Sequence, residues 1–156
     1  MFNLEQFIAH HITRRKESLF SADLQNHLPE LSERIAGQSV LVIGGAGTIG
    51  SSFIKALLPF RPSRLVVIDT SENGLTELTR DLRSTHALYV PNDYKTYPVN
   101  FADPVFAQIF RHYQPFGIVA NFAAHKHVRS EKDIFSVSAL LHNNVIHAGR
   151  LLSLLS

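Results

Sequence analysis

The chain has 156 residues, of which 45% are hydrophobic and 18% charged, a composition that is typical of one globular domain and excludes a disordered or fibrous protein. Its 15 Lys and Arg residues nearly balance 13 Asp and Glu residues, so its charge does not indicate a nucleic-acid partner. There is no cysteine, and no apolar run approaches the roughly 20 residues that a membrane span needs. We therefore expect a cytoplasmic protein without disulfides, a metal site or a membrane span.

The first 36 residues carry helical patterns of their own. In residues 2–16 apolar side chains recur at intervals of three and four, which predicts an amphipathic helix. Residues 19–36 predict one or two short helices with a break near Pro29. We expect residues 1–36 to form a helical appendage and residues 37–156 to form the main domain.

From Gly37 onward, short apolar runs alternate with helical patterns. The predicted strands are 39–43, 65–69 and 117–122, with a weaker strand within either 87–90 or 97–101. The predicted helices are 51–58, 71–84, 103–113 and 133–155. Apolar strands separated by helices are typical of a parallel sheet covered on both faces, so the fold class is α/β, a Rossmann-like doubly wound sheet. Such a sheet usually has about six strands, so we expect an incomplete one that stops after four strands and a long helix.

A glycine cluster follows the first predicted strand and opens the next helix. Gly44, Gly47 and Gly50 form a Gly-x-x-Gly-x-x-Gly pattern, and Gly45 also gives Gly-x-Gly-x-x-Gly. In this context, glycines allow the backbone to approach a pyrophosphate, and the following helix offers its N–H groups to that anion. The cluster therefore predicts a dinucleotide-binding loop. The phosphate-binding loop of NTPases is excluded, because Gly50 is followed directly by Ser51 and not by the lysine that this loop requires.

Asp69 stands at the end of the second predicted strand. A carboxylate there can accept hydrogen bonds from both hydroxyls of an adenosine ribose and would repel a 2′-phosphate, which favours NAD over NADP. The alternative is that Asp69 only caps the next helix and that the glycines only form a tight turn.

Residues 44–51, 69–75 and 123–128 together resemble the extended short-chain dehydrogenase/reductase family. The resemblance is narrower to bacterial nucleotide-sugar 4,6-dehydratases and epimerases of polysaccharide biosynthesis, in which Ala-Ala-Tyr-Lys-His-Val corresponds to residues 123–128 here. It covers roughly residues 38–156 and implies that residues 37–156 are the NAD-binding N-terminal half of such an enzyme.

The resemblance also implies a role for each residue of the candidate site. The residues that would contact the cofactor are Gly44, Gly47, Thr48, Ile49 and Gly50 at the pyrophosphate, Asp69 at the adenosine ribose, Asn100 and Phe101 beside the adenine, and Ala123, Ala124 and Lys126 along the nicotinamide ribose. The residues that would lie near the nucleotide sugar are Lys126, His127 and Asn144. The alternatives are an ordinary exposed loop for Lys126 and His127, and a solvent-facing position for Asn144.

We expect no catalytic residue within this chain. In the family, the Thr-Asp-Lys or Ser-Tyr-Lys set lies on and after the fifth strand, which would fall downstream of Ser156. The whole enzyme would oxidise C4 of a UDP-sugar with NAD, and either eliminate water or return the hydride to give an epimer. A stand-alone dinucleotide-binding module or regulatory subunit without catalysis is the alternative. We also expect a homo-oligomer, because the helix at 133–155 would expose an apolar face.

Overall fold

The computed structural model describes residues 4–15, 17, 19–85, 88–125 and 133–155. The chain divides into two compact units, Met1–Arg34 and Ile35–Ser156. None of the helices within the described ranges is long and apolar enough to cross a membrane.

The first unit is helical. Helix α1 (Leu4–Phe7) continues directly into a π-helical segment, Ile8–Ile12, and α2 spans Ser21–Ile35. The break that we predicted near Pro29 is wrong, because α2 runs through that residue. A proline removes only one backbone hydrogen bond, and the residues before and after Pro29 continue the helix.

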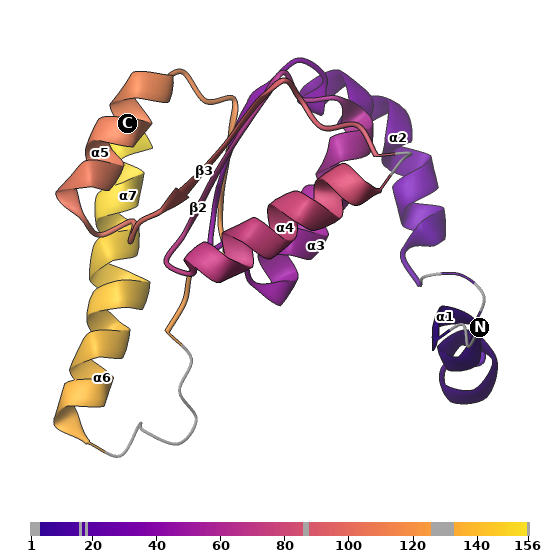
Figure 1. Ribbon diagram of the computed structural model, residues 1–156, viewed down its shortest axis with the longest axis horizontal. Helices are drawn as coiled ribbons and strands as arrows, with labels where there is room; N and C mark the ends of the chain where they lie inside the picture. The colour runs from indigo at the N-terminus through magenta and orange to yellow at the C-terminus, as the bar shows by residue number, and fades with distance from the viewer. Residues whose placement is uncertain (1–3, 16, 18, 86–87, 126–132, 156) are drawn as a thin grey trace. The chain divides into compact units, whose positions relative to one another are not determined.

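The second unit contains a four-stranded sheet. Its strands are β1 (Ser39–Ile43), β2 (Arg64–Asp69), β3 (Asp93–Pro98) and β4 (Ile118–Asn121). They pair in parallel in the order β3-β2-β1-β4 (Figure 1), which confirms the Rossmann-like α/β prediction. The chain therefore adds β2 and β3 on one side of β1 and then crosses back to place β4 on the other.

Strand β3 is the element that the sequence placed wrongly. It occupies 93–98, between the two ranges that we considered, and only overlaps the second of them at its end. The reason is its position at the edge of the sheet, where Lys95 is exposed and Asp93 and Tyr97 are only half-buried. An edge strand does not need the continuous apolar run by which buried parallel strands are recognised.

Helices cover both faces of this sheet (Figure 1). The helical elements are α3 (Thr48–Leu57), a 3₁₀ turn (Leu58–Phe60), α4 (Glu72–Ser84), α5 (Pro104–Tyr113), α6 (Ile134–Leu141), a π-helical turn (His142–His147) and α7 (Ala148–Leu155). Helices α3 and α4 lie on one face, and α5 and the run from α6 to α7 lie on the other. The predicted long helix at 133–155 is thus present, with a π-helical turn in its middle that the sequence pattern did not predict.

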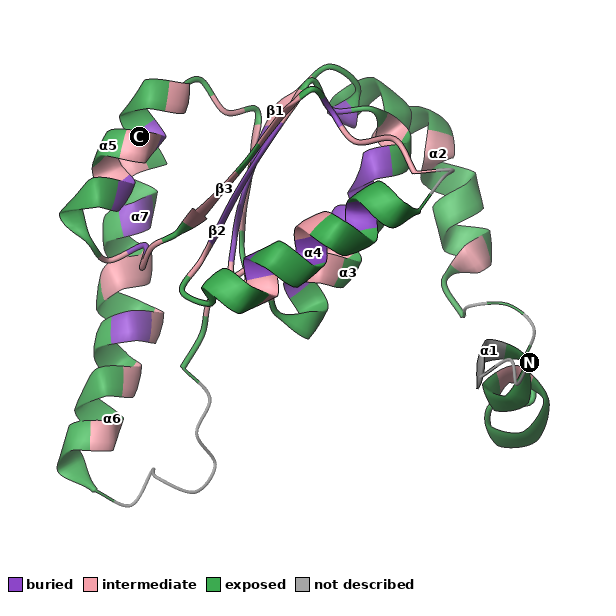
Figure 2. Ribbon diagram, in the orientation of Figure 1, coloured by how far each residue is buried: buried purple, intermediate pink, exposed green. Residues whose placement is uncertain are grey.

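The core lies between the sheet and the helices. On one face, side chains of β1 and β2 pack against two phenylalanines of α5 and one leucine of α7: Leu41, Ile43, Val66, Ile68, Phe106, Phe110 and Leu151. Figure 2 shows β1 and β2 as the buried centre of this unit. Fully burying one such side chain stabilises the fold by about 1.5–3 kcal/mol, so this contact fixes α7 relative to the carboxyl ends of the strands.

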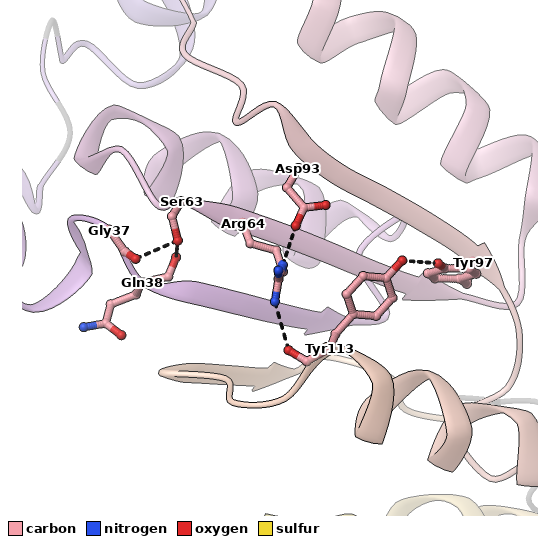
Figure 3. A network of polar contacts seen from close by, with 7 residues as sticks. All are labelled: Gly37, Gln38, Ser63, Arg64, Asp93, Tyr97 and Tyr113. Carbon is pink, nitrogen blue, oxygen red and sulfur yellow. Dashed lines mark hydrogen bonds and ion pairs between the residues drawn. The ribbon is translucent and has the colours of Figure 1, made fainter.

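A polar network connects the start of β2 with β3 and the end of α5 (Figure 3). The Arg64 guanidinium donates to the Asp93 carboxylate and, through Nη1, to the carbonyl oxygen of Tyr113 at 3.0 Å. The hydroxyls of Tyr113 and Tyr97 lie 2.6 Å apart. These hydrogen bonds connect the edge strand β3 to β2 and to the end of α5.

Candidate functional site

A pocket of about 230 Å³ lies at the carboxyl ends of β1, β2 and β4. In open parallel sheets, this is the edge at which ligands bind, at the point where the strand order reverses. The predicted cofactor residues that line the pocket are Gly44, Gly47, Asp69, Asn100, Phe101, Ala123 and Ala124. The fold therefore brings residues from four separate segments of the sequence to one cavity.

Two glycines of the loop after β1 are required by the fold itself. Gly44 has a φ of +75°, and a Cβ on it would lie 2.7 Å from the carbonyl carbon of Phe122. A Cβ on Gly50 would lie 2.8 Å from the Cα of Gly45. Both contacts are with backbone, which cannot move aside as a flexible side chain can. These two positions need glycine whether or not a ligand binds.

Gly47 is different. A Cβ on Gly47 would make one ordinary contact, 3.5 Å from the carbonyl oxygen of Gly44, so the fold leaves room for a side chain there. Gly47 nevertheless lines the pocket. A glycine that the protein's own packing does not require, at the wall of a cavity, is suited to a ligand that approaches the backbone closely.

Gly47 is also the N-cap residue of α3, and no side chain caps this helix. The first N–H groups of a helix have no acceptor within the helix, and together with the helix dipole they favour an anion. The predicted pyrophosphate contacts Thr48 and Ile49 belong to this first turn, and the Ile49 side chain is 70% exposed. Neither residue is among those that line the pocket, so any contact with a pyrophosphate would be made by their backbone N–H groups, and this role stays a prediction.

Asp69 joins the loops that surround the pocket. Its Oδ2 accepts a hydrogen bond from the Ala46 N–H, and its Oδ1 accepts one from the Ser71 N–H, both at 2.9 Å. The cap of α4 is Ser71, whose hydroxyl oxygen accepts from the Gly74 N–H at 3.1 Å. A carboxylate offers about four lone-pair positions, so Asp69 retains acceptor capacity for ligand hydroxyls after these two bonds.

The segment after β3 forms another wall. The Oδ1 of Asn100 accepts from the Ala102 N–H at 2.9 Å, which shapes the turn before α5. Phe101 is buried and packs edge-on against Phe106 and His147. The apolar side chains of Val99 and Ile68 also line the pocket here, so this end suits a flat, largely apolar group.

The segment after β4 is held by an asparagine of the π-helical turn. The Oδ1 of Asn144 accepts from the His125 N–H at 2.8 Å, and its Nδ2 donates to the His125 carbonyl oxygen at 3.0 Å. Asn144 thus pairs with the backbone of His125 much as a neighbouring strand would. Its predicted contact with a nucleotide sugar stays a prediction, and Lys126 and His127 lie outside the described residues.

Asn143 is a pocket residue that sequence reasoning missed. It is only 6% exposed, lines the pocket, and donates through Nδ2 to the Oδ1 of Asn144 at 3.0 Å. The available signal was a pair of adjacent asparagines within the predicted helix, because amide side chains that become buried need hydrogen-bond partners.

Tyr94 is followed directly by Lys95, but this tyrosine has a structural contact and is not part of the pocket. Its hydroxyl lies 3.2 Å from the Oγ1 of Thr79 on α4, and burial raises the pKa of the phenol. Tyr94 is not among the residues that line the pocket. The expectation that the catalytic residues lie outside this chain stays a prediction.

With this geometry established, comparison with known proteins gives the family. Residues 40–154 match the polysaccharide biosynthesis protein family. The chain belongs to this family. It is 30% identical over 99 residues to the probable polysaccharide biosynthesis protein EpsC of Bacillus subtilis, an alignment that covers 64% of this chain and 16% of EpsC. The chain therefore spans only 16% of the length of this curated family member.

Solved structures give the same fold. The enzyme WbmF of Bordetella bronchiseptica, in complex with NAD⁺, matches 78% of this chain and 33% of its own, with a TM-score of 0.55 and 20% identity. The UDP-N-acetylglucosamine 4-epimerase of Methanobrevibacter ruminantium, in complex with UDP-N-acetylmuramic acid, matches 77% and 34%, with a TM-score of 0.56 and 21% identity. These likenesses show that the chain shares the Rossmann-like fold of both enzymes, and the match covers about a third of each solved chain.

Proposed function

We propose that residues 35–156 are the NAD-binding portion of a UDP-sugar 4,6-dehydratase or epimerase of polysaccharide biosynthesis. The observation that carries the proposal is Gly47, a pocket-lining glycine at the uncapped start of α3 that the fold does not need. Family membership and the NAD⁺ complex of the structurally similar WbmF support the same ligand.

The residues present fit a nicotinamide dinucleotide. The bare backbone at Gly47 and the N–H groups of Thr48 and Ile49 would hold the pyrophosphate. Asp69 would accept hydrogen bonds from the adenosine ribose with its remaining lone pairs. Asn100 and Phe101 would lie beside the adenine, with Val99 next to them. Ala123 and Ala124 are small enough to let the nicotinamide ribose lie close to the end of β4.

Asp69 further favours NAD over NADP. Its carboxylate would stand where NADP carries a 2′-phosphate, and two negative charges at that distance repel each other. The segment that follows it, Thr70, Ser71 and Glu72, brings no cation to offset this repulsion.

The substrate class rests on the family and on the related epimerase. When bound, NAD would supply the hydride acceptor for oxidation at C4 of the sugar. The sugar oxidised at C4 would then either lose water, as in a dehydratase, or take the hydride back, as in an epimerase. Lys126 and His127 are the proposed contacts to the sugar nucleotide.

Titration calorimetry with NAD, NADP and UDP-N-acetylglucosamine tests the proposal. NAD is expected to bind more tightly than NADP, and Gly47→Ala is expected to weaken NAD binding by at least about tenfold, roughly 1.4 kcal/mol. The matched control is Gly149→Ala, because a Cβ at Gly149 also meets no obstacle but lies in α7, away from the pocket lining. Equal NAD binding by wild type and Gly47→Ala, or no NAD binding at all, would contradict the proposal.

A further inference from the structure

The segment after β3 brings one polar side chain to the wall of the pocket. It contributes Val99, Asn100 and Phe101 to the lining, and of these three residues only Asn100 can form side-chain hydrogen bonds. Strands β2 and β3 are neighbours in the sheet, with Asp69 in register with Pro98, so this wall lies beside the end of β2. A base attached to a ribose at Asp69 would therefore meet the wall formed by these three residues.

The orientation of the Asn100 amide follows from its hydrogen bond. Its Oδ1 faces the Ala102 N–H at 2.9 Å, and because a backbone N–H can only donate, the atom that faces it must be the oxygen. The carbonyl oxygen of Asn100 also accepts from the Asp103 N–H at 3.0 Å, so two bonds hold this turn. The acceptor of the side chain is thus engaged in the turn before α5.

The other half of the amide is available to a ligand. Asn100 is half-buried, and in the part of the chain that the structure describes its Nδ2 donates to no protein atom. A partly buried donor without a partner loses hydration unless a ligand supplies an acceptor. Asn100 therefore offers a hydrogen-bond donor to the base, between the apolar side chains of Val99 and Phe101.

Purine bases differ in what they present to such a donor. Adenine carries an amino group at C6, which is itself a donor, whereas a 6-oxopurine such as hypoxanthine or guanine carries a carbonyl oxygen there, which is an acceptor. Two donors that face each other both stay unpaired, but a donor that faces a carbonyl oxygen forms a hydrogen bond. The group at C6 thus decides whether the Asn100 amide finds its partner.

We propose that Asn100 reads the C6 position of the purine and favours a dinucleotide with a 6-oxo base over one with a 6-amino base. The inference rests on the proposed function, which places a ribose at Asp69 and the base beside Asn100, and it adds a preference between bases. Adenine still packs against Val99 and Phe101 and still binds, but without the hydrogen bond from Nδ2.

Titration calorimetry with NAD and with nicotinamide hypoxanthine dinucleotide, which differ in the purine alone, tests the inference. We expect the wild type to bind the hypoxanthine dinucleotide more tightly, by about threefold or more, and Asn100→Asp to bind NAD more tightly. The aspartate keeps an acceptor for the Ala102 N–H and presents a second acceptor to the base where the asparagine has a donor. The ratio of the two dissociation constants should therefore change by at least about tenfold.

Asn92→Asp is the matched control, because it makes the same change of charge at an exposed residue outside the pocket lining. It should keep the ratio of the wild type. Asn100→Ser is a second variant, whose hydroxyl can still accept from the Ala102 N–H but is too short to reach the base, and its ratio should move toward one. Far-UV circular dichroism reports whether each variant keeps its fold.

The outcomes separate the inference from the proposed function. A wild type that prefers NAD to the hypoxanthine dinucleotide would overturn the inference, as would a ratio that is the same in the wild type, Asn100→Asp and Asn100→Ser. In these cases both dinucleotides still bind, so the proposed NAD site stands. If neither dinucleotide binds to the wild type, the proposed function is contradicted and the inference fails with it.

Discussion

The carboxylate of Asp69 accepts a hydrogen bond from the backbone N–H of Ala46 at 2.9 Å, which connects the end of β2 to the glycine loop after β1. The other oxygen of the same carboxylate holds the Ser71 N–H. Asp69 therefore shapes the walls of the pocket before any ligand binds. Its proposed contact with a ribose would add to this role without replacing it.

Asp69→Asn replaces one of the two carboxylate oxygens by an NH₂ group. The asparagine keeps one acceptor and turns an NH₂ group toward the second backbone N–H, so either Ala46 or Ser71 loses its partner. We expect the free energy of unfolding to fall by about 1–3 kcal/mol, measured by urea denaturation, and NAD binding to weaken as well. Asp103→Asn is the control, because the Asp103 side chain makes no cap bond to α5. For Asp103→Asn, the free energy of unfolding should fall by less than about 1 kcal/mol. Equal decreases for the two variants would contradict the role of Asp69.

The sequence predicted the inner strands and the start of α5 well. Strand β1 spans the predicted residues 39–43, because a strand buried on both faces must be apolar throughout. Helix α5 begins at Pro104, within one residue of the predicted 103, since proline has no N–H to lose at the first helical position. The glycine loop was recognisable because its glycines recur at a fixed spacing between a strand and a helix, and the steric limit at Gly50 comes from Gly44 and Gly45 within the same loop.

The features that escaped prediction depend on contacts between distant segments. Strand β3 is held at the edge by the Arg64–Asp93 pair and by the contact of Tyr97 with Tyr113, none of which a local hydrophobic pattern reveals. The π-helical turn with Asn143 is similar, because its asparagines find partners only once the segment after β4 lies beside it. Site residues supplied by backbone geometry are thus easier to predict than those supplied by tertiary polar contacts.

Gly50→Ala is expected to destabilise the fold strongly. The new Cβ would collide with the backbone of Gly44 and Gly45, and overpacking of this kind costs about 1–3 kcal/mol or more. Chemical denaturation should show a lower unfolding midpoint. By contrast, Gly149→Ala should be neutral or stabilising by up to about 1 kcal/mol, because alanine favours the helix and has room there. If Gly50→Ala proved as stable as the wild type, the loop could not have the close packing described here.

Asn144→Ala removes both hydrogen bonds to the backbone of His125. We expect the His125 amide to exchange its hydrogen faster, by at least about tenfold if the bond contributes roughly 1.4 kcal/mol to local protection. Hydrogen exchange followed by NMR measures this directly. Asn73→Ala, at an exposed position of α4, is the control and should leave the His125 amide unchanged. Unchanged exchange in Asn144→Ala would show that the segment after β4 is held in another way.

The Tyr97–Tyr113 contact predicts a loss of stability at alkaline pH. Burial, and then the hydrogen bond to Tyr113, raise the pKa of Tyr97 from 10.0 to about 12. A raised pKa means that the folded state favours the neutral phenol, so this contribution is complete below pH 10 and is lost as the pH rises toward 12. Because Tyr97 is only half-buried, we expect the loss to be about 1 kcal/mol.

Urea denaturation at about pH 9 and about pH 11 measures this effect as the difference between the two free energies of unfolding. Tyr97→Phe should be less stable than the wild type at the lower pH, by about 0.5–1.5 kcal/mol, because the Tyr113 hydroxyl loses its partner. It should also lose less stability between the two pH values, since the group that titrates is gone. Tyr89→Phe is the control, because Tyr89 bonds to the Pro62 carbonyl and leaves the Tyr97–Tyr113 pair intact. An alkaline loss of the same size in wild type and Tyr97→Phe would mean that another group titrates in this range and that the contact at the edge strand does not set the pH dependence.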